Sequence, residues 1–171
     1  ADEQLLVASE QDKRPNDWSP DGRFLAYSSV DPTTSFDLWM LPLDSNKKPF
    51  PFLKTAADEM WLSFSPDGRW VAYCSNASGA YQVYVRPFPG SGGKWQISMG
   101  GGQYPIWSRD GRELLFETPD RRVMTASYTA KDDSFAVGGP QVWSATRLRD
   151  LGADSNYDLA PEGRRLAAVL A

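Results

Sequence analysis

Short apolar runs separated by turn residues follow one another along the chain, most clearly between residues 61 and 98. Leu62-Ser-Phe64 predicts a short strand, and a second strand, Arg69–Cys74, follows it after a turn. Alternate side chains of Arg69–Cys74 point to opposite faces, and both faces are apolar, so we expect this strand to be covered on both sides. Two further runs, Tyr81–Arg86 and Lys94–Ser98, complete a unit of four strands.

A phrase made of an apolar or aromatic residue, a short turn and an acid-Gly-Arg sequence returns four times. Its copies are Trp18-Ser-Pro-Asp21-Gly22-Arg23, Phe64-Ser-Pro-Asp67-Gly68-Arg69, Trp107-Ser-Arg-Asp110-Gly111-Arg112 and Leu159-Ala-Pro-Glu162-Gly163-Arg164. Proline and aspartate favour the first turn positions, and glycine tolerates a positive φ at the last. The phrase therefore predicts a hairpin turn, and we interpret its acids and glycines as structural residues.

The other repeats follow the same plan. We expect one domain, 1–171, made of an outer strand at 3–8, blades at 15–54, 61–98 and 104–146, and a partial blade at 156–170. Four-stranded units that recur every 43 to 52 residues are typical of propeller blades. The predicted fold is an all-β propeller with about three complete antiparallel blades and a partial blade, as a partial ring or half of a larger ring.

The composition excludes several kinds of chemistry. The formal net charge of −4 argues against a nucleic-acid partner. The absence of histidine removes His-containing triads, and the single cysteine, Cys74, rules out an intrachain disulfide and a thiolate metal site. No apolar stretch approaches the roughly 18 residues of a membrane span, so we expect no direct membrane insertion. We predict no catalytic residues and no resident metal or cofactor.

The repeated phrase resembles the inner hairpin of TolB-type, WD-repeat-like β-propellers. A narrower run, Tyr84–Ser98 continued through Trp107–Leu115, resembles the C-terminal propeller of bacterial membrane serine/threonine kinases. The resemblance implies a non-catalytic protein-binding or sensor module in the periplasm or elsewhere outside the cytoplasmic membrane. It also implies a full ring with more blades than this sequence encodes. The sequence departs from the resemblance in lacking the kinase domain and membrane helix that precede such propellers.

An incomplete ring would expose the flat faces of its end blades and their unpaired strand edges. We therefore expect the chain to form a homodimer, in particular two half-rings that make eight blades, or to be joined to the remainder of a longer chain that completes the ring. A structural fragment without activity of its own is a further alternative.

Binding groups concentrate on loops carried by a rigid scaffold. We expect the loops that enter the inner strands to share one face of the propeller and to bind a protein or peptide. The candidate residues on this face combine charge, aromatic surface and hydrogen-bonding capacity. They are Arg14, Asn16, Glu59, Trp61, Gln103, Tyr104, Asn156 and Tyr157.

Two alternatives depend on acidic residues. A lyase or glycosidase would use paired carboxylates such as Asp58, Glu59 and Asp154 in a central channel, because such pairs perform acid–base chemistry without histidine. Calcium is the least implausible metal, since oxygen ligands cluster in loops that enter the inner strands. The candidate ligands are Asp12, Asp17, Asp58, Glu59 and Asp154.

Overall fold

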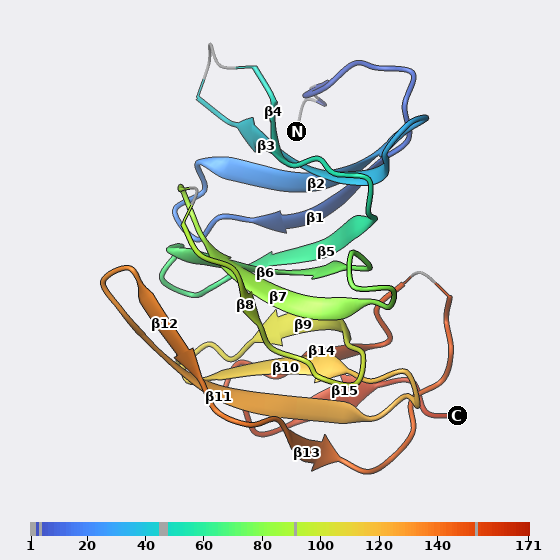
Figure 1. Cartoon of the computed structure of the whole chain (residues 1–171), viewed down its shortest axis with the longest axis vertical. Coiled ribbons are helices and arrows are strands. Elements are labelled where there is room, and N and C mark those ends of the chain that lie inside the picture. Colours follow the sequence, from blue (N-terminus) through green and yellow to red (C-terminus); the bar gives the residue numbers. More distant parts are fainter. Residues whose placement is uncertain (1–2, 4, 45–47, 91, 153) are drawn as a thin grey trace.

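The structure, a computed structural model, describes residue 3 and residues 5–44, 48–90, 92–152 and 154–171. The secondary-structure elements in this part of the chain are all β-strands, and they form four antiparallel blades (Figure 1). Blade 1 contains β1 (Lys13–Trp18), β2 (Phe24–Asp31), β3 (Ser35–Pro42) and β4 (Phe50–Leu53). Blade 2 contains β5 (Glu59–Phe64), β6 (Trp70–Ser75), β7 (Gln82–Pro87) and β8 (Trp95–Gln96).

Blade 3 has one strand more than the plan predicts. It contains β9 (Gln103–Trp107), β10 (Glu113–Glu117), β11 (Val123–Lys131), β12 (Ser134–Val137) and β13 (Gln141–Ser144). Both β12 and β13 pair with β11, at opposite ends of this long strand. Blade 4 contains β14 (Tyr157–Leu159) and β15 (Leu166–Ala168). The described residues include no helix of the length and apolarity that a membrane span requires.

Each blade packs on the next through an apolar layer. On β6, Val71 and Tyr73 lie in the cluster shared with blade 1, whereas Trp70, Ala72 and Cys74 lie in the cluster shared with blade 3. The expectation that this strand is covered on both faces is therefore confirmed. A third cluster joins blades 3 and 4. Face-to-face packing of successive four-stranded meanders, shown for the first three blades in Figure 1, makes this all-β fold a partial β-propeller.

The repeated phrase forms the turn between the first two strands of each blade. In blade 1 the N–H of Gly22 donates to the carbonyl of Ser19 at 2.8 Å, and Gly22 has a φ of 70°. The Asp21 carboxylate accepts hydrogen bonds from the Ser19 hydroxyl at 2.6 Å and from the N–H of Arg23 at 3.0 Å. The same set of bonds recurs in blades 2 and 3. Side chain and backbone together thus hold the hairpin in one shape.

The turn of blade 4 keeps its glycine and loses the side-chain bonds of the others. Gly163 has a φ of 73°, and its N–H donates to the carbonyl of Ala160 at 2.8 Å. Alanine stands where the other blades have serine, and Glu162 forms an ion pair with Arg165 instead. The positive φ is therefore the feature common to all four turns.

Gly68→Ala tests the backbone requirement of these turns. Gly68 has a φ of 69°, and an added Cβ would meet Pro20 only at an ordinary 3.5 Å. Because space is available, the cost comes from the left-handed backbone, which disfavours residues with a Cβ by about 1 kcal/mol. We expect urea denaturation to show that loss for G68A and none for Gly90→Ala, whose φ is not positive and whose Cβ would meet nothing. Equal stability of both variants would contradict this account.

Two expectations about the strands were wrong. Residues 3 and 5–8, part of the outer strand expected at 3–8, form no strand, and residue 4 lies outside the described part. Leu5 is 79% exposed, and no neighbouring strand offers these residues the hydrogen bonds that a sheet requires. The four-strand plan for the blade at 104–146 also left out β12, whose Phe135 is buried against blade 2.

Candidate functional site

The innermost strands of blades 1, 2 and 3 each contain one extra residue at the same place. The ladder skips Asn16 between Pro15 and Asp17. It sets two residues of β5, Trp61 and Leu62, against Tyr73, and two residues of β9, Tyr104 and Pro105, against Phe116. Such a bulge bends a strand and turns a side chain away from the ladder. Trp61 and Tyr104 occupy equivalent positions in these bulges and have φ values of 54° and 53°.

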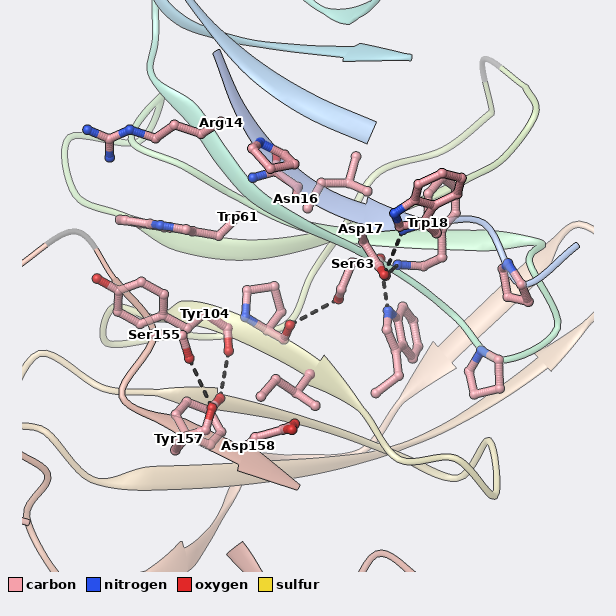
Figure 2. A pocket seen from close by; sticks show the side chains of 18 of the residues that line it. Arg14, Asn16, Asp17, Trp18, Trp61, Ser63, Tyr104, Ser155, Tyr157 and Asp158 are labelled. Atoms are coloured by element: carbon pink, nitrogen blue, oxygen red, sulfur yellow. Dashed lines mark hydrogen bonds between the residues drawn. The ribbon is translucent and has the colours of Figure 1, made fainter. Parts of the chain in front are cut away.

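The bulged strands line one cavity. This inner-strand groove has a volume of about 660 Å³ and is formed by β1, β5, β9 and the segment around β14. Figure 2 shows Arg14, Trp61 and Tyr104 one above another at one end of the groove and Trp18 at the other end. All four blades therefore contribute to a single open site.

Five of the eight candidate residues line this groove. They are Arg14, Asn16, Trp61, Tyr104 and Tyr157. All five belong to inner strands, whereas we expected loops. The bulges explain the positions of Asn16, Trp61 and Tyr104, because they let these strand residues face the groove.

An aromatic group at one end of the groove is fixed by hydrogen bonds. The rings of Trp61 and Tyr104 are 4.4 Å apart between centroids. The Tyr104 hydroxyl donates to the carbonyl of Gly152 at 2.7 Å, and the Tyr157 hydroxyl donates to the carbonyl of Tyr104 at 2.6 Å. Burial raises the pKa of Tyr104 to about 12, so its hydroxyl remains a neutral donor. This part of the groove is therefore preorganised.

Hydrogen bonds also connect the inner strands of neighbouring blades along the groove. The Asp17 carboxylate of blade 1 accepts the N–H of Phe64 in blade 2 at 2.8 Å. Burial raises the pKa of Asp17, against the lowering effect of the N–H groups of Phe64 and Trp18. Between blades 2 and 3, the indole N–H of Trp107 donates to the carbonyl of Ser63 at 3.1 Å. These bonds set the spacing of the groove walls.

The other three candidate residues lie outside the groove lining. Glu59 is 2% exposed and accepts a hydrogen bond from the Thr55 hydroxyl. Gln103 pairs across the ladder with Glu117, and Asn156 donates from its side chain to the carbonyl of Arg149. Their contacts are local ones that support the strands and loops beside the groove.

The acids expected in a catalytic pair do not meet in the groove. Asp154 lines it, whereas Asp58 and Glu59 do not. The Asp58 carboxylate instead accepts hydrogen bonds from the Asn76 side chain at 2.9 Å and the Tyr81 hydroxyl at 3.0 Å. Among the described residues, no three or more Asp, Glu, Cys or His side chains are grouped so that they could hold a metal ion.

The sequence interpretation missed several groove residues. The turn phrase itself supplies Trp18 and Trp107, and the residue before it supplies Asp158. The equivalent Asp17 was considered only as a calcium ligand. The available signal was the alternation along each inner strand, which places neighbouring side chains on different sides.

The fold and groove define a β-propeller whose inner strands form a candidate binding site. Among solved structures, a protein of Agrobacterium tumefaciens assigned as TolB matches 77% of this chain and 50% of its own, with 20% identity and a TM-score of 0.59. TolB from Acinetobacter baumannii matches 95% of this chain and 44% of its own, with 14% identity and a TM-score of 0.58. The fold is thus a TolB-like β-propeller.

A third solved structure has the same fold. It is a Bacteroides uniformis protein assigned as a 6-phosphogluconolactonase, with 18% identity, a TM-score of 0.55, and coverage of 91% of this chain and 47% of its own. A curated relative, tricorn protease homolog 1 of Streptomyces coelicolor, is 31% identical over 114 residues, which are 64% of this chain and 10% of that protein. No family model matches the chain. The chain spans about half the length of these solved structures and a tenth of the curated relative.

Proposed function

We propose that the chain is a non-catalytic propeller module that binds a protein or peptide segment along the inner-strand groove. The observation that carries this proposal is the groove itself, a cavity of about 660 Å³ with contributions from four blades. Its wall combines the fixed rings of Trp61 and Tyr104 with the exposed side chains of Arg14 and Arg109. Aromatic and arginine residues contribute most to protein interfaces, and a preorganised site loses little entropy on binding.

The groove favours binding over the carboxylate-dependent lyase or glycosidase. That alternative needs two acids facing one substrate, and of its three candidates only Asp154 lines the groove. The other two acids of the lining accept backbone hydrogen bonds, Asp17 from Trp18 and Phe64 and Asp158 from Leu159. The fold alone does not decide between binding and catalysis, since one protein of this fold is assigned as a lactonase. The position of the acids is therefore the argument that distinguishes the two functions.

The cellular role follows from the resemblance of residues 84–115 to kinase propellers. We propose that the module is the sensor part of a receptor-type serine/threonine kinase and lies outside the cytoplasmic membrane. The complete open reading frame tests this proposal. A kinase domain and a membrane helix upstream of the propeller would support it, and a reading frame without them would contradict it.

We also propose that the chain associates with a second copy of itself. Support comes from the exposed apolar side chains at both ends of the row of blades, among them Trp18 at 55% and Val169 at 44%. Propeller rings are closed structures, and an exposed blade face is apolar surface that association removes from water.

Selection of peptides from a random library displayed on phage tests groove binding. We expect enriched peptides, and we expect the best synthetic peptide, measured by fluorescence anisotropy, to bind the double variant Arg14→Glu/Arg109→Glu about tenfold more weakly. Arg23→Glu is the matched control, since its side chain is 68% exposed and it does not line the groove. Failure to enrich any peptide, or equal affinity for all three proteins, would overturn the proposal.

A further inference from the structure

Two equivalent positions come together at each junction between blades. They are the apolar residue that begins the turn phrase of one blade and the residue before the phrase in the preceding blade. Phe64 donates its N–H to the Asp17 carboxylate at the first junction, and Trp107 donates its indole N–H to the Ser63 carbonyl at the second. At the third junction Leu159 and Ile106 occupy these positions and pack in one apolar cluster. We call this the junction pair.

The two ends of the chain each carry half of a junction pair. Trp18 is the phrase residue of blade 1 and is 55% exposed, whereas its equivalents Phe64, Trp107 and Leu159 are 6%, 6% and 8% exposed. Asp158 is the preceding residue of blade 4 and is exposed. Its Oδ1 accepts the N–H of Leu159 at 2.8 Å, as the Oδ1 of Asp17 accepts the N–H of Trp18 at 2.8 Å. Blade 4 thus repeats the acceptor that blade 1 presents to blade 2.

The open face of blade 4 also repeats the apolar positions that the next blade covers elsewhere. Ala26, Ala72 and Leu115 are each 0% exposed at the third position after their phrase arginine. Ala167 occupies the same position in blade 4 and is exposed, and Val169, two residues later, is 44% exposed. This face therefore has apolar positions that the next blade would bury, and no blade of the described chain covers them.

We propose that blade 1 of a second copy occupies this face, with its Trp18 against Asp158, Ala167 and Val169. The contact is used twice, since the Trp18 of each copy meets the Asp158 of the other. Two chains then form one ring of eight blades. A pair of tryptophan and aspartate combines the donor of the second junction, a tryptophan indole N–H, with the acceptor of the first, an aspartate carboxylate. The occupant is a second copy because its blade 1 carries the complementary half.

This inference rests on the proposed self-association and adds the residues that perform it. Sedimentation velocity over about 1–100 µM is expected to show a dimer for the unmodified chain. Trp18→Glu places a carboxylate opposite Asp158, and Asp158→Ala removes the acceptor, so we expect each to weaken the dimer about tenfold or more. The matched controls are Val142→Glu, since Val142 is 54% exposed, and Asp154→Ala, which removes an exposed acid beside the same groove.

A mixing experiment tests whether the contact is reciprocal. Equal amounts of the Trp18→Glu and Asp158→Ala chains form a pair with one intact junction, so the mixture is expected to associate more tightly than either variant alone. A monomer of the unmodified chain at 100 µM would overturn self-association and the junction pair together. A dimer that both variants leave unchanged, or a mixture no tighter than its components, would overturn the junction pair and leave self-association standing.

Discussion

Phe135→Ala is expected to lower the free energy of unfolding by about 3–5 kcal/mol, the usual cost of removing a buried aromatic ring. Phe135 lies on β12 and is 5% exposed. Its ring lies 5.1 Å from Trp70 and 5.8 Å from Trp95 of blade 2, between ring centroids, and 5.2 Å from Tyr128 of its own blade. Alanine would leave a cavity between two blades that these large rings refill only in part.

Urea denaturation followed by tryptophan fluorescence measures this loss. Val142→Ala is the control, because Val142 lies on β13 of the same blade and is 54% exposed. The control is expected to change stability by less than about 0.5 kcal/mol. A loss below about 1 kcal/mol for F135A would show that the β11–β12 hairpin does not pack on blade 2.

Glu59→Gln is expected to raise the free energy of unfolding by about 2 kcal/mol at pH 7.5 and to have little effect at pH 4. Glu59 is 2% exposed, and its Oε2 has no hydrogen-bond partner among the described residues. Burial raises the pKa of this carboxyl above its usual 4.5, the hydroxyl and backbone of Thr55 oppose that rise, and the charges of Asp37 and Asp58 add to it. Ionisation of Glu59 therefore costs free energy in the folded state.

The direction of the pH dependence follows from the raised pKa. The folded chain holds this proton more tightly than the unfolded chain, so Glu59 favours folding below pH 4.5 and loses that contribution as the pH rises through its folded pKa. Glutamine remains neutral throughout, so the advantage of E59Q grows with pH. Urea denaturation at several pH values measures it, with Glu10→Gln, at an exposed position, as control. A variant less stable than the unmodified chain at pH 7.5 would contradict the assignment.

The parts of the fold that the sequence predicts are those that depend on residues close together along the chain. The glycine of each acid-Gly-Arg phrase has a positive φ, a conformation that the turn needs and that glycine adopts without the steric cost of a Cβ. The alternation along Trp70–Ser75 likewise predicts a strand covered on both sides, because period-2 apolar faces have no other stable arrangement. The repeat of these two signals was sufficient to predict propeller blades.

The features that were missed depend on partners distant in the sequence. Residues 131–134 are polar and do not indicate a strand, and Phe135 becomes a core residue only through the rings of blade 2. The described residues of the segment expected as a strand at 3–8 form no strand. An apolar run without a neighbouring strand cannot form the hydrogen bonds of a sheet.

In the candidate site, too, the sequence predicts what depends on residue type and misses what depends on distant partners. Residue types alone selected Arg14, Trp61 and Tyr104 as candidates, and the structure places all three along the groove. The same reasoning could not show that Glu59 is buried, because the sequence near a turn does not distinguish an acid that faces solvent from one that faces a neighbouring blade. The bulges that aim the inner strands at the groove depend on cross-strand register, which the sequence does not display.

Hydrogen–deuterium exchange of the chain with and without the best selected peptide tests the central claim most directly. The account predicts slower exchange in the inner strands β1, β5 and β9, which line the groove, and unchanged exchange in the outer strands β4 and β13, which do not. Protection confined to the outer strands, or no protection at peptide concentrations that saturate binding, would contradict a binding site built from the innermost strands.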